Sequence, residues 1–266
     1  MLLAIDIGNT NIVTGVFRGE QLLTHWRFST DGGRTADELA VFLKIVFEEK
    51  GLKFSDITGV AISSVVPPLT PQAAQLARDY FQIDPLIIGP DTDTGLTNEY
   101  SNPTDVGADR LVNSLAAWNK FSQNGKCACI VADFGTATTV DAVSHDKRYL
   151  GGAIAPGLHI STDALFRAAA RLPRVELREP PGEEALARST SASMQAGLVY
   201  GYAGLVKELV ARCLEEMPGR GCEKSVVIAT GGLASLIAPL VPAVDHIEPD
   251  LTLEGLRLIW HQRYAS

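Results

Sequence analysis

The architecture of this chain is set by two short stretches, Asp6-Ile7-Gly8-Asn9-Thr10 near its start and Asp133-Phe134-Gly135-Thr136-Ala137-Thr138 near its middle. Each follows an apolar run that is typical of a buried strand. In both, glycine lets backbone N–H groups approach phosphate oxygens, hydroxyl groups donate further hydrogen bonds, and the aspartate can position a hydrated cation. One such turn could be an ordinary hairpin. Two of them, one domain length apart, indicate a duplicated domain that holds a polyphosphate from both sides.

The residues around the two stretches repeat one order of elements. Apolar or alternating runs predict strands at 2–7, 11–17 and 20–28, a helix to about 50 with the capping box Thr35 and Glu38, a strand at 59–65, a helix after Pro67-Pro68 and a strand at 85–88. The order then recurs, with strands at 128–132, 136–143 and 149–154, helices at about 159–171 and 190–215, strands at 225–229 and 244–247, and a helix from Thr252. The sequence therefore predicts an α/β protein of two βββαβαβ repeats, with domains at 1–118 and 119–266.

The composition is that of a globular protein and narrows the classes of partner. Of 266 residues, 46% are hydrophobic and 20% are charged, and the formal net charge is −8 without a basic run, so nucleic acid is a poor candidate partner. The four cysteines have no zinc-binding spacing and are expected to be reduced structural thiols. Since the chain shows neither a signal peptide nor an apolar run of about 20 residues, we expect a cytoplasmic protein with no membrane partner.

Another kind of site is predicted at Gly107-Ala108-Asp109-Arg110, where an amphipathic helix begins. The positive end of a helix favours an anionic substrate. Arg110 can form a bidentate contact with a substrate carboxylate, and Asp109 can accept a hydrogen bond from a substrate hydroxyl and orient it toward a phosphoryl group. Taken alone, Asp109 could also be an ordinary first-turn acidic residue and Arg110 its surface partner.

Six motifs together resemble those of the type III pantothenate kinases, a family in the superfamily of acetate and sugar kinases, actin and the heat-shock ATPases. They are Asp6–Asn11; Tyr100–Pro103 with Gly107–Arg110; Asp133–Thr138; Gly151–Gly157; Thr190 with Met194 and Gly197; and Thr230–Gly232. In this order they span nearly the whole chain. The resemblance implies two actin-like, or ribonuclease H-like, domains with an ATP cleft between them.

The resemblance also implies roles for individual residues. It assigns ATP binding to Asp6, Ile7, Gly8, Asn9, Thr10, Asn11, Ile12, Val13 and Thr136, and pantothenate binding to Tyr100, Gly107, Ala108, Asp109, Arg110 and Thr190. Asp109 matches the catalytic base. Asp6 would hold Mg²⁺ through water, and Asp133 would hold a monovalent cation, K⁺ or NH₄⁺. The implied reaction converts ATP and pantothenate to ADP and 4′-phosphopantothenate, the first committed step toward coenzyme A.

The predicted helix at 190–215 carries Gly197, Gly201 and Gly204. Such small residues allow another helix to come close, either from the same chain or from a second one. The resemblance implies a homodimer with this region at its interface. It further suggests an active site that is shared between Asp109 of one chain and Thr190 of the other.

Three other functions stay open at this point. A sugar kinase of the same superfamily would keep the fold and change the acceptor, and a polyphosphate phosphohydrolase would use the same loops with water as the acceptor. The third is a non-catalytic transcriptional accessory protein, since some members of the family were named for such effects. Asp109 and Arg110 count against a degenerate site of this kind.

Overall fold

The computed structural model describes residues 1–89, 91–169 and 171–264, which form two compact units. Unit 1 comprises Met1–Leu96, Tyr100–Ala116 and Thr252–Ser266, and unit 2 comprises Thr97–Glu99 and Ala117–Leu251. Each unit has its own sheet and its own apolar core.

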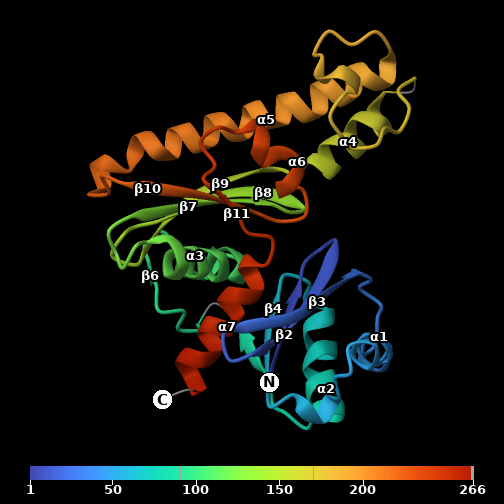
Figure 1. Ribbon diagram of the computed structural model, residues 1–266, viewed down its shortest axis with the longest axis vertical. Helices are drawn as coiled ribbons and strands as arrows, with labels where there is room; N and C mark the ends of the chain where they lie inside the picture. The colour runs from blue at the N-terminus through green and yellow to red at the C-terminus, as the bar shows by residue number, and fades with distance from the viewer. Residues whose placement is uncertain (90, 170, 265–266) are drawn as a thin grey trace. The chain divides into compact units, whose positions relative to one another are not determined.

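Unit 1 is built on a five-stranded sheet with the order β3-β2-β1-β4-β5. Figure 1 labels its strands β2, β3 and β4. The strands are β1 (Leu2–Ile7), β2 (Asn11–Arg18), β3 (Gln21–Ser29), β4 (Gly59–Ser64) and β5 (Leu86–Ile88). The first three form an antiparallel meander, while β4 and β5 continue the sheet parallel to β1. The strand β1, which ends at Asp6-Ile7, therefore lies at the centre of the sheet.

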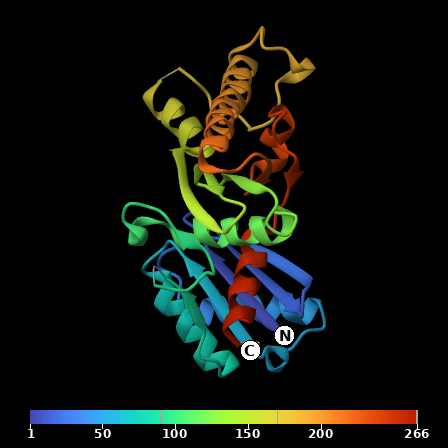
Figure 2. The ribbon, with the colours of Figure 1, turned by 90° about the vertical axis from the view of Figure 1, so that its left-hand side faces the viewer.

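Helices cover both faces of this sheet, because side chains along β1 alternate between two apolar clusters. The helices are α1 (Ala36–Glu49), α2 (Leu69–Phe81), α3 (Ala108–Phe121) and α7 (Leu251–Tyr264). Leu3, Ile5 and Ile7 pack with α1 and α2. Leu2 and Ala4 pack with α3 and α7, and Figure 2 shows α7, in red, lying along the blue strands. The two faces of the sheet are thus distinguishable residue by residue.

Unit 2 contains a six-stranded sheet with the order β11-β10-β7-β8-β9-β6. Its strands are β6 (Thr97–Asn98), β7 (Ala128–Phe134), β8 (Ala137–Val143), β9 (Arg148–Pro156), β10 (Ser225–Thr230) and β11 (His246–Ile247). Its helices are α4 (Leu158–Ala168), α5 (Thr190–Glu216) and α6 (Ala234–Ile237). Although α5 has 27 residues, no helix in the described ranges is both long and apolar enough to cross a membrane.

The two units repeat one topology. The order β3-β2-β1-β4-β5 corresponds to β9-β8-β7-β10-β11, with the same antiparallel and parallel pairs. The predicted α/β fold of two βββαβαβ repeats is therefore confirmed, and so is the capping box, in which Thr35 accepts from the Glu38 N–H and Glu38 accepts from the Thr35 N–H. The helix α4 ends at Ala168 rather than near residue 171, ahead of Pro173, which cannot continue a helix.

The units differ from the predicted domains, 1–118 and 119–266, in the place of α7. This helix belongs to unit 1 because Leu253, Leu256 and Ile259 are buried in a cluster with the sheet of that unit. The packing is close at Gly59, where a Cβ would lie 2.3 Å from the ring of Trp260. Two continuous segments cannot describe a unit that contains both the first residues of the chain and its C-terminal helix. The domain boundary near residue 118 stays a prediction.

Candidate active site

Asp6 lies on the α3 side of the unit 1 sheet. Alternation along β1 establishes this, because Ala4 packs with α3 and α7 while Ile5 and Ile7 pack with α1 and α2. Val13, the partner of Asp6 on β2, packs on the α3 side too. The Asp6 side chain is half-buried at the carboxyl end of a central strand, where α/β sheets bind ligands.

The loop after β1 is held by hydrogen bonds from Thr30, the residue that follows β3. The Gly8 N–H donates to the Asn11 carbonyl at 3.0 Å. Thr30 donates its hydroxyl to the Gly8 carbonyl at 2.6 Å and its N–H to the Thr10 carbonyl at 2.9 Å. Asn9 and Thr10 are exposed at the tip of the loop. The sequence gives no local signal for Thr30, because it reaches the loop only through strand pairing.

Not every residue of the predicted ATP loop offers its side chain to a ligand. Ile7 and Ile12 are 0% and 1% exposed, within the cluster against α1 and α2. Val13 packs in the opposite cluster. A contribution of these three residues to nucleotide binding would therefore come from the backbone, while Asn9 and Thr10 have accessible polar side chains.

At the start of α3, Arg110 is buried beside Tyr100. It is 6% exposed, and its guanidinium carbon lies 5.8 Å from the centre of the Tyr100 ring, a distance at which the ring face attracts a cation. Asp109 is half-buried, and its Oδ1 accepts a hydrogen bond from the Arg110 N–H at 2.9 Å. Gly107 leaves room for this carboxylate, because a Cβ there would lie 2.5 Å from the same oxygen. The alternative of Arg110 as a surface residue is wrong.

The start of α3 and Asp6 belong to the same face of the sheet. The helix packs there through Val112 and Leu115, in the cluster that contains Ala4. Unit 1 thus supplies one carboxylate at the end of β1 and a carboxylate with a neighbouring guanidinium at the start of α3. This arrangement can bind a cation and orient an acceptor that carries an anionic group.

In unit 2, Asp133 is the second-last residue of β7, as Asp6 is of β1. Ala132 and Phe134 pack in the cluster with α5, so Asp133 faces away from α5. Gly231 packs directly against it: its φ is 90°, and a Cβ would lie 2.4 Å from Asp133 Oδ1 and 2.7 Å from the Phe134 nitrogen. Glycine is required at this position, because any side chain would displace the end of β7.

The turn that contains Thr136 is supported by Gly157, just after β9. A Cβ on Gly157 would lie 2.0 Å from the carbonyl oxygen of Thr136 and 2.8 Å from that of Gly135. Gly157 and Gly231 both stand in motifs that the sequence displays. Their contacts with the turn could not be recognised there, because they join segments that are remote in sequence.

Thr190 belongs to unit 2, whereas the other predicted pantothenate contacts belong to unit 1. It is the first residue of α5 and is exposed. The helix is capped by Ser189, whose hydroxyl accepts a hydrogen bond from the Ala192 N–H at 3.3 Å. The structure thus brings Tyr100 and Arg110 together, while the contact of Thr190 with pantothenate stays a prediction.

The chemistry of both aspartates suits hard cations, which prefer oxygen ligands. Beside Asp6, the hydroxyl of Ser63 is buried without a hydrogen-bond partner in the described part of the chain. Beside Asp133, the backbone of Gly231 packs against the carboxylate, and a Cβ there would lie 2.4 Å from Asp133 Oδ1. Residues 1–89, 91–169 and 171–264 contain no cluster of three or more His, Cys, Asp or Glu side chains able to hold a metal ion.

Comparison with known proteins identifies the family. The family model described as type III pantothenate kinase matches residues 2–212. The type III pantothenate kinase of Anaeromyxobacter sp. (strain Fw109-5) is 50% identical over 263 residues, which cover 99% of each chain. This chain belongs to the type III pantothenate kinase family.

Two solved structures are similar in fold to this member of the type III pantothenate kinase family. A Campylobacter jejuni protein assigned to the Baf family of transcriptional activators has a TM-score of 0.60 at 18% identity, over 99% of this chain and 100% of its own. The inorganic polyphosphate/ATP-glucomannokinase of Arthrobacter sp. strain KM has a TM-score of 0.50 at 17% identity, over 98% of each chain. At these identities the likeness concerns the fold alone, which is the duplicated actin-like fold of the sugar kinases.

Proposed function

We propose that this chain is a pantothenate kinase, which transfers the γ-phosphoryl group of ATP to the hydroxyl of pantothenate. The products are ADP and 4′-phosphopantothenate, in the first step of coenzyme A biosynthesis. The observation that carries this proposal is the 50% identity to a type III pantothenate kinase over 99% of both chains, because it extends across every candidate segment. The geometry at the start of α3 supports it independently.

The start of α3 is proposed to bind the acceptor, which has a carboxylate at one end and a primary hydroxyl at the other. Arg110 is held against Tyr100, so its guanidinium is preorganised for the carboxylate. Asp109 accepts the hydrogen bond of the substrate hydroxyl and orients its oxygen in line with the γ-phosphorus. Because the transition state of phosphoryl transfer is loose, Asp109 acts mainly by positioning and takes the proton as the new bond forms.

The loops after β1 and β7 are proposed to bind the phosphates of ATP. Asn9 and Thr10 are accessible donors on the first loop, and Thr136 belongs to the second. Asp6 would hold Mg²⁺ through water, and Asp133 would hold K⁺ or NH₄⁺. When bound, these ions supply positive charge that offsets the charge of the phosphates. That a single nucleotide contacts both loops stays a prediction from the sequence.

We also propose a homodimer in which α5 meets a second chain. Gly197, Gly201 and Gly204 lie on the exposed side of α5, where an added Cβ would meet nothing within 4 Å, while the opposite side of the helix packs in the core. Packing within the chain therefore does not explain them. Each glycine costs a helix about 1 kcal/mol relative to alanine, and a closely packed partner helix would offset this. The active site would then combine Asp109 of one chain with Thr190 of the other.

A panel of acceptors tests the function. The protein is incubated with ATP, Mg²⁺ and K⁺, with pantothenate, with hexoses and without an acceptor, and the release of ADP is followed. Pantothenate is expected to raise the rate far above the rate without an acceptor, and the hexoses are not. A hexose that outperforms pantothenate would indicate a sugar kinase, and equal rates with and without acceptors would indicate a phosphohydrolase. No release under any condition would favour an accessory protein.

A further inference from the structure

Ser63, on β4, has a hydroxyl without a hydrogen-bond partner among the residues that the structure describes. The residue is 0% exposed, so water does not satisfy the group from the surface. Buried polar groups in native proteins nearly always have a partner, and each exception calls for an explanation. The hydroxyl of Ser63 is therefore a candidate for a hydrogen bond that forms only when a ligand binds.

The fold places this hydroxyl beside Asp6. The strands β1 and β4 are parallel neighbours, and Ser63 is the register partner of Asp6. Ala61 packs in the cluster on the α3 side and Ile62 in the cluster on the α1 side, so Ser63 faces the α3 side, as Asp6 does. Neighbouring strands are about 4.8 Å apart, so a change of the Ser63 χ1 rotamer brings Oγ within reach of the Asp6 carboxylate.

We propose that Ser63 is a positioning residue for Asp6, whose carboxylate accepts a hydrogen bond from the Ser63 hydroxyl when magnesium and nucleotide are bound. The inference rests on the proposed function, since it takes Asp6 as the carboxylate that holds hydrated Mg²⁺. A bond to one carboxylate oxygen leaves the other directed at the water shell of the ion. It also restricts Asp6 to one rotamer, which lowers the entropy that is lost when the ion binds.

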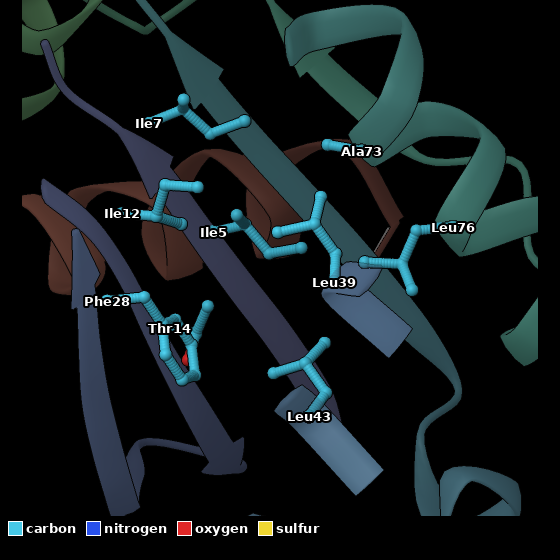
Figure 3. A pocket seen from close by; sticks show the side chains of 9 residues that line it. All are labelled: Ile5, Ile7, Ile12, Thr14, Phe28, Leu39, Leu43, Ala73 and Leu76. Carbon is cyan, nitrogen blue, oxygen red and sulfur yellow. The ribbon is translucent and has the colours of Figure 1, made fainter. Parts of the chain in front are cut away.

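Thr14, on β2, provides a matched control. Its hydroxyl is also without a partner in the described residues, and the residue is 2% exposed. It belongs to the same sheet but lines a cavity on the opposite face, with Ile12 and Phe28 (Figure 3). Thr14→Val therefore removes a buried hydroxyl of the same sheet without changing the Asp6 side, while Ser63→Ala removes the hydroxyl next to Asp6.

The experiment measures binding rather than turnover. The affinity for a non-hydrolysable ATP analogue is determined by calorimetry in EDTA and at increasing Mg²⁺, for the wild type and both variants, together with the melting temperature of each protein without ligand. Ser63→Ala is expected to need about tenfold more Mg²⁺ for half of the magnesium-dependent gain in affinity, since a hydrogen bond to a charged group is lost. Its affinity in EDTA and its melting temperature should not fall. Thr14→Val should follow the wild type in its magnesium dependence.

Two results would overturn the proposal. The first is an unchanged magnesium dependence of Ser63→Ala, and the second is an equal loss of affinity with and without Mg²⁺, or a lower melting temperature, which would indicate a merely structural role. Because pantothenate is absent, the outcome does not depend on the acceptor. A protein that binds magnesium and nucleotide but does not phosphorylate pantothenate would contradict the proposed function, while the titration would still decide the role of Ser63.

Discussion

Asp109 is the side chain on which turnover should depend most. Asp109→Asn preserves the size of the side chain, but an amide cannot receive the hydroxyl proton and orients the acceptor oxygen less well. The turnover number is expected to fall about 100-fold or more. The affinity for pantothenate should change little, because the proposed contact of Arg110 with the carboxylate is kept. The rate of ADP release and calorimetric binding of pantothenate measure the two quantities separately.

Asp84→Asn is the control for this change. Asp84 is a carboxylate of the same unit whose side chain is 81% exposed and pairs with Arg78 at 2.9 Å. Its removal should leave turnover at the wild-type value, because exposed ion pairs contribute little. An equally unaffected turnover number in Asp109→Asn would exclude Asp109 from the catalytic role.

Replacement of Thr14 by valine is expected to stabilise the folded protein. Figure 3 shows its side chain among apolar neighbours that include Phe28, around a cavity of about 10 Å³. Thr14→Val keeps the shape of the side chain and replaces a hydroxyl that has no partner in the described chain with a methyl group. The free energy of unfolding should rise by about 1 kcal/mol, which appears as a higher urea midpoint at an unchanged slope. A lower midpoint would show that the hydroxyl has a stabilising partner.

At the scale of residues, the sequence indicated the three aspartates of the site but not the hydroxyl residues that lie beside Asp6 and its loop. Asp6, Asp109 and Asp133 were recognisable because each stands within two residues of a glycine in a short motif. Ser63 and Thr30 were not, because a hydroxyl in or after a strand has no distinctive local pattern. Their importance arises from strand register, which joins residues that are far apart in the chain.

At the scale of elements, the turn after β10 should control the second aspartate. Gly231→Ala would force Asp133 to move, since the new Cβ would lie 2.4 Å from its Oδ1, and it would also occupy a φ of 90°. We expect the free energy of unfolding to fall by about 1–3 kcal/mol. Most of the activity measured in K⁺ should also be lost. Gly232→Ala is the control, because a Cβ there meets nothing within 4 Å and should be tolerated.

The comparison is made in potassium and in sodium. The wild type and Gly232→Ala should lose activity sharply when K⁺ is replaced by Na⁺, whereas the residual activity of Gly231→Ala should depend little on the cation. Equal activity of the wild type in both salts would refute Asp133 as a monovalent cation ligand. Similar behaviour of the two glycine variants would show that the close approach to Asp133 is not required.

Elements were predictable where their signal is local. Alternating runs gave the strands, and Thr35 with Glu38 gave the start of α1. Two features were not predictable: α7 completes the unit at the other end of the chain, and β6 pairs with β9 rather than with the strands that precede it. Both depend on contacts between residues that are remote in sequence, for which a single sequence has no pattern.

At the scale of the whole molecule, subunit mixing tests the shared active site. Asp109→Asn and Thr190→Arg are prepared separately, each expected to be nearly inactive, and are mixed under conditions that allow exchange. In a mixed dimer with two-fold symmetry, one site collects both defects and the other collects neither. Since about half of the dimers are mixed, each with one of two sites intact, recovery should approach about a quarter of wild-type activity.

The alternative arrangement predicts no recovery. If Thr190 serves the site of its own chain, every site in a mixed dimer carries one defect, so activity remains at the level of the parents. The mixture must be shown to contain mixed dimers, for example with one variant carrying a mass tag. Activity that stays at the level of the parents in such a mixture would contradict the shared site. It would not contradict the proposal that the wild-type protein is a kinase.

The fate of the γ-phosphate decides whether this chain is a pantothenate kinase. ATP labelled at the γ-phosphate is incubated with the protein, Mg²⁺, K⁺ and equimolar pantothenate and glucose, and the labelled products are separated. Nearly all of the label is predicted in 4′-phosphopantothenate, with little in inorganic phosphate or in sugar phosphate, because the roles proposed for Arg110 and Asp109 select an acceptor with a carboxylate and a hydroxyl. Label that accumulates in sugar phosphate or inorganic phosphate, with none on pantothenate, would contradict the assignment.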